Sequence, residues 1–206
     1  MLVACESSGA VRRAFRARGH NAWSCDIKQA EDDSHFHIRT DVVGLLEHRI
    51  HPDACESAYD DDRPLAWDLL IAFPPCTDLA VSGARWFPAK VADGRQGRAL
   101  GFVRMLMGAD VPRIAIENPV SIISSAIRRP DQTIQPWQFG HGEVKRTCLW
   151  LKNLPLLVPT NIVEGREARV WKMGPSPTRA ADRARTFDGI AAAMAAQWGG
   201  CDDARR

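Results

Sequence analysis

The sequence predicts an α/β fold in which a doubly wound, mostly parallel sheet carries helices on both of its faces. Short apolar runs that suit buried strands alternate with segments whose apolar residues repeat at helical spacing. The runs are continuously apolar, as parallel strands covered on both faces are. Because 206 residues are enough to bury such a core, we expect residues 1–206 to form a single domain.

The expected elements follow one another along the chain. Buried strands are expected where the runs are short and apolar, at residues 2–5, 22–25, 68–72, 113–116 and 148–151. Helices are expected where apolar residues share one face, at residues 9–18, 98–107 and 189–198. Gly19 ends the first of these helices. The acidic, proline-flanked stretch at residues 51–64 is expected to be a surface loop.

Composition excludes several classes of protein. No apolar run approaches the roughly 20 residues that span a bilayer, and no basic flank precedes the first apolar residues, so we expect neither a membrane span nor a signal peptide. The six cysteines form no CxxC pair, which argues against a zinc site and indicates reduced thiols in a cytoplasm. His35 and His37 have no third ligand near them in the sequence, so a surface strand is expected there and no metal.

Charge is unevenly distributed along the chain. Residues 1–62 carry a net charge of −5, whereas residues 63–206 carry +7. A basic surface of this kind suits a polyanion such as DNA.

Ligands of parallel sheets bind outside the carboxyl ends of the strands, where this sequence places turns of small or polar residues. The first turn lets the backbone approach a nucleoside cofactor, and Asp26 can accept both ribose hydroxyls. Asp41 can reach the adenine amino group. An ordinary helix-starting loop with a serine N-cap explains the first turn equally well. The predicted cofactor contacts are Cys5, Glu6, Ser7, Ser8, Gly9, Asp26, Ile27, Asp41 and Pro74.

Cys76 follows two prolines that leave the strand at residues 68–72. The prolines restrict the backbone, so the turn carries the thiol rigidly past the strand end. Glu117 is expected at the equivalent place after the neighbouring strand. A structural cysteine and a helix-capping carboxylate are the alternatives for the two residues taken singly. Together they predict a thiolate nucleophile beside a carboxylic acid that exchanges a proton.

These residues resemble the Pro-Cys and Glu-Asn motifs of the DNA (cytosine-5) methyltransferases. Further segments match that family in its order, at residues 5–9, Asp26, Asp41, Ser82-Gly83, Phe139-Gly140, Lys145-Arg146, residues 166–169 and Gly189. The chain departs from the family pattern at Ser7, Pro119, Thr147 and Ile190. It resembles a compact phage-like or orphan member, because residues 152–166 are too few for the large target-recognition domain that family members usually carry.

The resemblance implies a Rossmann-like methyltransferase fold that binds S-adenosylmethionine and methylates carbon 5 of a flipped cytosine in DNA, in a bacterial or phage-infected cell. It implies catalytic roles for Cys76, Glu117 and Arg146, with Arg85 or Arg146 lowering the pKa of the thiol. It implies DNA contacts from Ser82, Arg85, Trp86, Asn118 and Lys145. Without a recognition domain, sequence selectivity is expected to be low or to come from a second copy of the chain.

Two other hypotheses stay open. One is a different one-carbon modification of a pyrimidine, with a modified cofactor or on RNA. The other is a DNA-binding module on the same fold without catalytic activity, although intact Cys76 and Glu117 argue against it. An enzyme that methylates an amino group is disfavoured, because Phe73 precedes the prolines where such an enzyme needs an acid or an asparagine.

Overall fold

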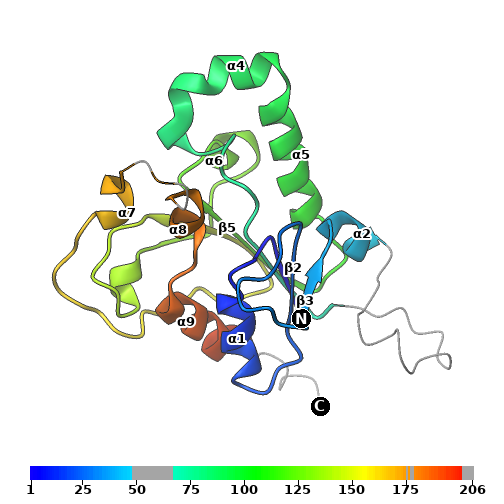
Figure 1. The fold of residues 1–206 in the computed structure, drawn as a ribbon, viewed down its shortest axis with the longest axis vertical. Coiled ribbons are helices and arrows are strands. Elements are labelled where there is room, and N and C mark those ends of the chain that lie inside the picture. The colour runs from blue at the N-terminus through cyan, green and yellow to red at the C-terminus, as the bar shows by residue number, and fades with distance from the viewer. Residues whose placement is uncertain (48–66, 175, 177–178, 201–206) are drawn as a thin grey trace.

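A computed structural model describes residues 1–47, 67–174, 176 and 179–200 of the chain. The loop expected at residues 51–64 lies outside these residues, as do Cys55 and Cys201. Seven strands form one sheet (Figure 1): β1 (Leu2–Ala4), β2 (Trp23–Asp26), β3 (His37–Arg39), β4 (Leu69–Ala72), β5 (Arg113–Pro119), β6 (Gln132–Ile134) and β7 (Thr147–Lys152).

The sheet is doubly wound and mostly parallel, as the sequence predicts. Its strand order is β3-β2-β1-β4-β5-β7-β6. The first five strands in this order pair in parallel, and β7 runs antiparallel between β5 and β6. The chain starts in the middle of the sheet, builds outward through β2 and β3, and then crosses back to β4. The fold class is therefore a Rossmann-like α/β fold.

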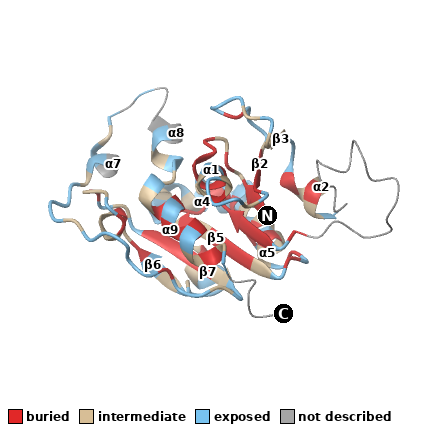
Figure 2. Ribbon diagram, turned by 90° about the horizontal axis from the view of Figure 1, so that it is seen from below, coloured by how far each residue is buried: buried red, intermediate tan, exposed pale blue. Residues whose placement is uncertain are grey.

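Helices cover both faces of the sheet. One buried cluster joins β-strand residues such as Leu70 and Ile114 to α2 (Val42–Glu47), α5 (Arg95–Met107) and α6 (Ile123–Ala126). The other joins residues such as Ile71 and Leu149 to α1 (Ala10–Arg16) and α9 (Asp188–Trp198). Adjacent strand residues thus point to opposite cores, and the strands are buried between these layers (Figure 2).

The remaining helices lie around the carboxyl end of the sheet. The 3₁₀ helix η1 (Val81–Trp86) leads into α4 (Phe87–Ala92), and α4 and α5 form a projection from the body of the molecule, at the top of Figure 1. The others are short: η2 (Pro136–Gln138), α7 (Arg169–Lys172) and α8 (Arg179–Ala184). No helix in the described part of the chain is long and apolar enough to cross a membrane.

Strand β5 is longer than the sequence predicts. The expected strand ends at residue 116, with Glu117 and Asn118 in a turn, but β5 continues to Pro119. Its parallel neighbour β4 ends opposite Ile116, whereas antiparallel β7 goes on pairing, with Leu149 opposite Glu117. Glu117 and Asn118 are therefore strand residues, and the ladder with β7 sets their orientation.

Candidate active site

The turns predicted to hold ligands leave the sheet at a common level. Ala4 of β1 lies opposite both Cys25 of β2 and Ala72 of β4, and Ala72 lies opposite Ile116. The residues that follow these positions therefore start at the same edge of the sheet, which we call the carboxyl edge. Because the strands end in register, the predicted cofactor residues and the predicted catalytic residues lie on one side of the molecule.

The turn that carries Cys76 is held from both of its ends. On the upstream side, the Asn118 amide donates a hydrogen bond to the Pro74 carbonyl at 2.9 Å. On the downstream side, the amides of Leu79 and Ala80 donate to the Cys76 carbonyl at 3.0 and 2.8 Å. Strand β5 thus supplies both the carboxyl group of Glu117 and the side chain that positions the turn beside it.

Cys76 and Glu117 interact electrostatically. Burial raises the pKa of the Cys76 thiol, and the negative charge of Glu117 raises it further. Burial also raises the pKa of Glu117, whereas the Lys145 ammonium and a hydrogen bond with Thr147 lower it. Lys145 and Arg183 lower the pKa of Cys76 and partly offset the rise. The arrangement favours a neutral thiol beside a carboxyl group that readily holds a proton.

The cations that act on the pKa of Cys76 differ from those expected from the sequence, Arg85 or Arg146. Arg146 is exposed, and its charge acts on Cys148 rather than on the thiol of Cys76. The cation whose charge acts on both Cys76 and Glu117 is its neighbour Lys145, which was predicted to contact DNA. The pKa of Cys76 is raised, not lowered, because burial and Glu117 outweigh the nearby cations.

Arg183 was missed by sequence reasoning. It lies in α8, far along the chain from the motifs, and no pattern in residues 179–184 distinguishes it. The Lys145 ammonium donates to the carbonyl of Arg185 at 3.3 Å and lies 5.8 Å from the centre of the Phe187 ring. These contacts bring the segment after α8 onto Lys145, on the same side as Cys76.

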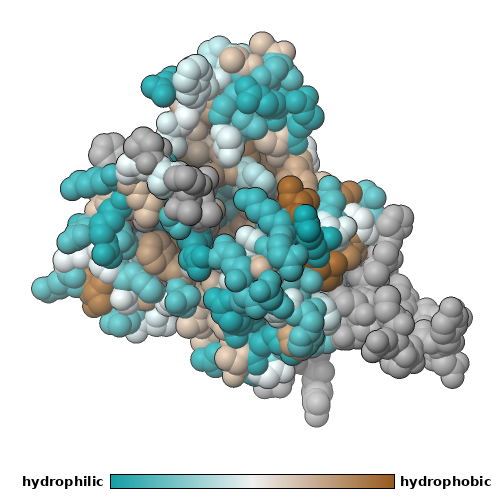
Figure 3. All heavy atoms as spheres, viewed as in Figure 1, coloured by the Kyte–Doolittle hydropathy of each residue, from teal (hydrophilic) through white to brown (hydrophobic). Residues whose placement is uncertain are grey.

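The residues predicted to contact DNA have different surroundings. Ser82, Arg85 and Trp86 lie exposed on η1, where the Arg85 guanidinium stands 5.0 Å from the centre of the Trp86 ring. Trp86 is 56% exposed, which leaves its ring free to stack on a base. Asn118 is buried and donates to the Pro74 carbonyl, which gives it a positioning role in this turn, and its contact with DNA stays a prediction. Hydrophilic side chains cover much of the projection and the face around it (Figure 3).

The acids predicted to bind a nucleoside gather around Cys5. Burial raises the pKa of the Cys5 thiol to about 12, and the charges of Asp26, Cys25 and Asp41 contribute to the rise. Cys5 has a positive φ of 59°, which turns the chain sharply as it leaves β1. Ile27, beside Asp26, is 70% exposed and provides an apolar surface at this place. These residues suit the ribose and base of a nucleoside.

Other residues of the first turn serve the protein itself. The Glu6 carboxylate accepts hydrogen bonds from the amides of Val11 and Arg12, at 2.7 and 3.3 Å, and so caps α1. Burial raises the pKa of Glu6, and these amides partly offset the rise. The Ser8 hydroxyl accepts only a long bond of 3.4 Å from Ala10. Glu6 rather than serine is therefore the main cap, and the predicted cofactor contact of Glu6 is left to its backbone.

Gly9 and Ser7 of the same turn are also held by contacts with other residues of the protein. Gly9 has φ of 67°, and a Cβ there would collide with the guanidinium of Arg12. Arg12 is fully buried, where it donates to the Ser24 hydroxyl at 3.0 Å and pairs with Asp32. The Ser7 carbonyl accepts a bond from the Glu31 amide at 2.9 Å. The positive φ and the buried ionic network both account for the glycine, and its contact with a cofactor stays a prediction.

His37 belongs to the same network. Its ring lies 2.8 Å from the Ser24 hydroxyl and 2.9 Å from the Lys28 carbonyl. Among the described residues, no group of three or more histidine, cysteine or acidic side chains is placed to hold a metal ion.

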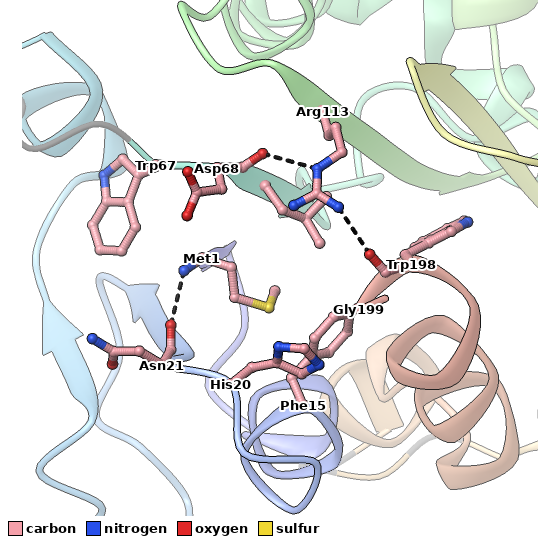
Figure 4. Close-up of a pocket in the computed structure, with 10 residues that line it drawn as sticks. Met1, Phe15, His20, Asn21, Trp67, Asp68, Arg113, Trp198 and Gly199 are labelled. Carbon is pink, nitrogen blue, oxygen red and sulfur yellow. Dashed lines mark hydrogen bonds between the residues drawn. The ribbon is translucent and has the colours of Figure 1, made fainter. Parts of the chain in front are cut away.

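A cavity of about 170 Å³ lies at the opposite edge of the sheet, at the amino ends of the strands (Figure 4). Arg113 crosses it, donating to the carbonyls of Asp68 at 3.3 Å and Trp198 at 3.1 Å. These bonds join the start of β5 to the end of α9. The cavity lies away from Cys76 and Glu117, so we do not assign it to the candidate active site.

No family model matches the chain, and no curated protein matches it in sequence. Forty chains of solved structures match it in fold. One is a protein provisionally named as a DNA modification methyltransferase encoded within a prophage (E. coli), with 15% identity and a TM-score of 0.49 over 79% of this chain and 51% of that one. The chain thus spans about half the length of that structure. A likeness this distant says nothing of function, and the Rossmann-like fold class follows from the strand order of the sheet itself.

Proposed function

We propose that the chain transfers a methyl group from S-adenosylmethionine to carbon 5 of cytosine in DNA. The observation that carries the proposal is the place of Cys76 and Glu117 at the carboxyl edge, where Asn118 of β5 holds the Pro74 carbonyl at 2.9 Å. The charges of Glu117 and Lys145 act on the Cys76 thiol there. A thiol nucleophile and a carboxyl group that holds a proton are the two groups that covalent activation of a pyrimidine requires.

The target base has to leave the helix to reach these groups. The Cys76 sulfur, in its ionised form, attacks and forms a bond to carbon 6, and the electrons of the ring double bond move toward carbon 5. Glu117 donates its proton to ring nitrogen 3, which stabilises the electron-rich ring. Bound S-adenosylmethionine supplies the methyl group that carbon 5 takes up. A base then removes the proton of carbon 5, the bond between sulfur and carbon 6 breaks to return the thiolate, and ring nitrogen 3 gives its proton back to Glu117.

The residues at the carboxyl edge fit this cofactor. Asp26 and Asp41 lie close enough to Cys5 for their charges to act on its thiol, which gathers two carboxylates beside the turn that follows β1. Strand β1 is paired with β4, and the Phe73 amide donates to the Ala4 carbonyl at 3.0 Å. A nucleoside held by the two acids therefore adjoins the segment that leads through Pro74 to Cys76.

Asp26→Ala is expected to weaken S-adenosylmethionine binding by roughly 1.5–3 kcal/mol, the range for a hydrogen bond to a charged group. Asp26→Asn is the matched variant, because it can keep the bond that Asp26 accepts from the Lys28 amide at 2.9 Å. The affinity for S-adenosylmethionine that Asp26→Asn loses therefore measures the contribution of the negative charge of Asp26 alone. Calorimetry measures the dissociation constant of S-adenosylmethionine in both variants. An unchanged dissociation constant in Asp26→Ala would show that the cofactor does not bind at Asp26.

Lys145→Met is expected to shift the pH profile of methyl transfer to higher pH at both limbs. The Lys145 ammonium lowers the pKa of Cys76 and that of Glu117, so its loss raises both. The reactive form combines an ionised thiol with a protonated carboxyl group. The rate therefore rises through the lower apparent pKa of the pair and falls through the higher one.

The measurement is kcat/KM against pH, with Lys145→Arg as the variant that keeps the positive charge. Lys145→Arg is expected to stay close to wild type. If the profile of Lys145→Met coincided with that of wild type, Lys145 would have no part in the ionisation of the pair.

The proposed function is tested with DNA that contains 5-fluorocytosine, in the presence of labelled S-adenosylmethionine. Fluorine replaces the proton that has to leave carbon 5, so a methyltransferase of this kind stays covalently bound to the DNA. Label and protein should then migrate together, with the cross-link at Cys76. A non-catalytic DNA-binding module forms no cross-link. Trapping on RNA alone, or trapping without transfer of label, would favour a related pyrimidine modification instead.

The short segment at residues 152–166 predicts low sequence selectivity. Residues 152–166 run as a loop beside residues 137–143, with Gly140 donating to Asn161 at 2.7 Å and Val163 to Trp137 at 3.0 Å. A loop of this size supplies few base contacts, each of which is worth about 1–3 kcal/mol of discrimination. We expect methylation in short or relaxed contexts, and binding that weakens steeply as salt rises.

Bisulfite sequencing of treated mixed-sequence DNA measures the selectivity. Modification confined to one motif of about four or more fixed bases would require a reader larger than the loop at residues 152–166, since each base needs its own contacts. Light scattering would then test whether a second copy of the chain supplies that reader.

A further inference from the structure

We propose that Lys90 is a positioning residue for the Cys76 nucleophile, because it anchors the α4 projection to the two residues that follow Cys76 in the chain. This inference rests on the proposed function for its catalytic consequence, but the anchor itself is a property of the fold.

Lys90 is a buried cation. Its side chain is 7% exposed, although α4 belongs to a projection whose other side chains are largely in solvent. A buried ammonium group is costly unless it is paired and hydrogen-bonded. The groups that meet this requirement belong to the two residues that follow Cys76. The position of the lysine is therefore tied to the turn that carries the thiol.

The partners of Lys90 are Thr77 and Asp78. The ammonium group donates a hydrogen bond to the Thr77 carbonyl and lies 3.4 Å from a carboxylate oxygen of Asp78 as an ion pair. The Phe87 ring, one turn earlier on α4, has its centre 5.9 Å away. The neighbouring helix α5 adds a second contact, since the Gln96 amide donates to the Asp78 carbonyl at 3.4 Å.

These contacts complete the support of the turn. Asn118 holds Pro74, two residues before Cys76, and Lys90 holds Thr77, one residue after it. The thiol is thus bracketed by one anchor from the sheet and one from the projection. Arg85 and Trp86, which are exposed and predicted to meet DNA, lie on η1, the 3₁₀ helix that leads into the projection. The Lys90 anchor therefore fixes the distance between Arg85 and Trp86, which are predicted to contact DNA, and the Cys76 thiol.

Lys90 therefore acts by geometry and differs from Lys145 in its role. Its positive charge is met by the Asp78 carboxylate, whereas the cations that lower the pKa of Cys76 are Lys145 and Arg183. A shift of about an ångström in a reacting group costs on the order of a hundredfold in rate. Loss of the anchor is expected to act on turnover and to leave substrate binding nearly unchanged.

The experiment compares Lys90→Met with wild type in two assays. In the first, trapping and methyl transfer on DNA are expected to show kcat reduced by about a hundredfold, with KM for DNA and cofactor within about threefold of wild type. In the second, the free protein is alkylated with iodoacetamide, and mass spectrometry follows Cys76. With the anchor lost, the limiting alkylation rate at high pH, where the thiol is ionised, is expected to rise by about threefold or more.

Three further variants serve as controls. Lys90→Arg keeps the cation and is expected to recover most of the turnover. Arg98→Met removes an exposed cation from α5 on the same projection and is expected to behave as wild type. Asp78→Asn weakens the anchor without removing the lysine, and it replaces Lys90→Met if that variant does not fold.

The outcomes separate the two proposals. Wild-type kcat and a wild-type alkylation rate in folded Lys90→Met, or in Asp78→Asn where that variant takes its place, would show that Lys90 does not position Cys76. Equal losses in Lys90→Arg and Lys90→Met would reduce the lysine to a packing role and also overturn the inference. If wild type itself forms no adduct with 5-fluorocytosine DNA, the proposed function fails, and the alkylation assay alone decides whether the anchor exists.

Discussion

Cys76→Ser is expected to reduce methyl transfer to below about one per cent of wild type and to abolish the adduct with 5-fluorocytosine DNA, because a hydroxyl is a far poorer nucleophile than a thiolate. The structure adds a second reason. Burial and Glu117 raise the pKa even of the thiol, and the same surroundings disfavour an ionised hydroxyl more strongly. Cofactor affinity is expected to stay within about twofold, since the proposed contacts of Cys76 are with the base.

Cys148→Ser is the matched control. Cys148 lies on β7 opposite Asn118 and contacts the Thr133 hydroxyl at 3.8 Å, a contact that serine can keep. This variant is expected to retain trapping. Turnover above about one per cent in Cys76→Ser, with normal cofactor binding, would rule out a covalent step at this residue.

The sequence predicted the architecture well where strands are buried on both faces. The runs that became β1, β4 and β7 are continuously apolar, as strands between two helical layers are, and only Ser24 interrupts the run that became β2. A surface strand was expected at His35 and His37, and β3 begins at His37. The three-residue strand β6 was missed, because it contains a single apolar residue, Ile134, and no pattern distinguishes it from loop.

The candidate site was predicted in outline only. Level strand ends explain why Cys5, Asp26 and Cys76 share an edge, and such ends follow from a parallel sheet. Lys145 and Arg146 are adjacent, and the course of the chain just before β7 decides which of them acts on the Cys76 thiol. Lys145 acts on Cys76 and Arg146 acts on Cys148, which the sequence alone does not indicate. Helix α8 comes more than a hundred residues after Cys76, so sequence spacing does not indicate that Arg183 acts on the thiol. Lys90 is buried because α4 folds back onto Thr77 and Asp78, which sequence spacing does not indicate either.

Glu117→Gln is expected to separate the two functions of this carboxyl group by changing turnover and thiol reactivity in opposite directions. Methyl transfer should fall by roughly 10²–10⁴-fold, the usual contribution of a positioned general acid, because an amide cannot give up a proton to the ring. The reactivity of Cys76 toward iodoacetamide below its pKa should instead rise. The negative charge of Glu117 raises the pKa of that thiol, so its removal lowers the pKa and increases the thiolate fraction.

The opposite signs make the Glu117 experiment decisive, since a variant that merely disturbs the site has no reason to make the thiol more acidic. The alkylation midpoint should move to lower pH in Glu117→Gln. It should stay at its wild-type value in Glu143→Gln, which alters a second buried carboxyl group, one that accepts a bond from Arg169 at 2.5 Å and is not among the groups acting on Cys76. If turnover and thiol reactivity fell together in Glu117→Gln, the carboxyl group would be holding the turn in place and the proton-transfer role proposed for it would be wrong.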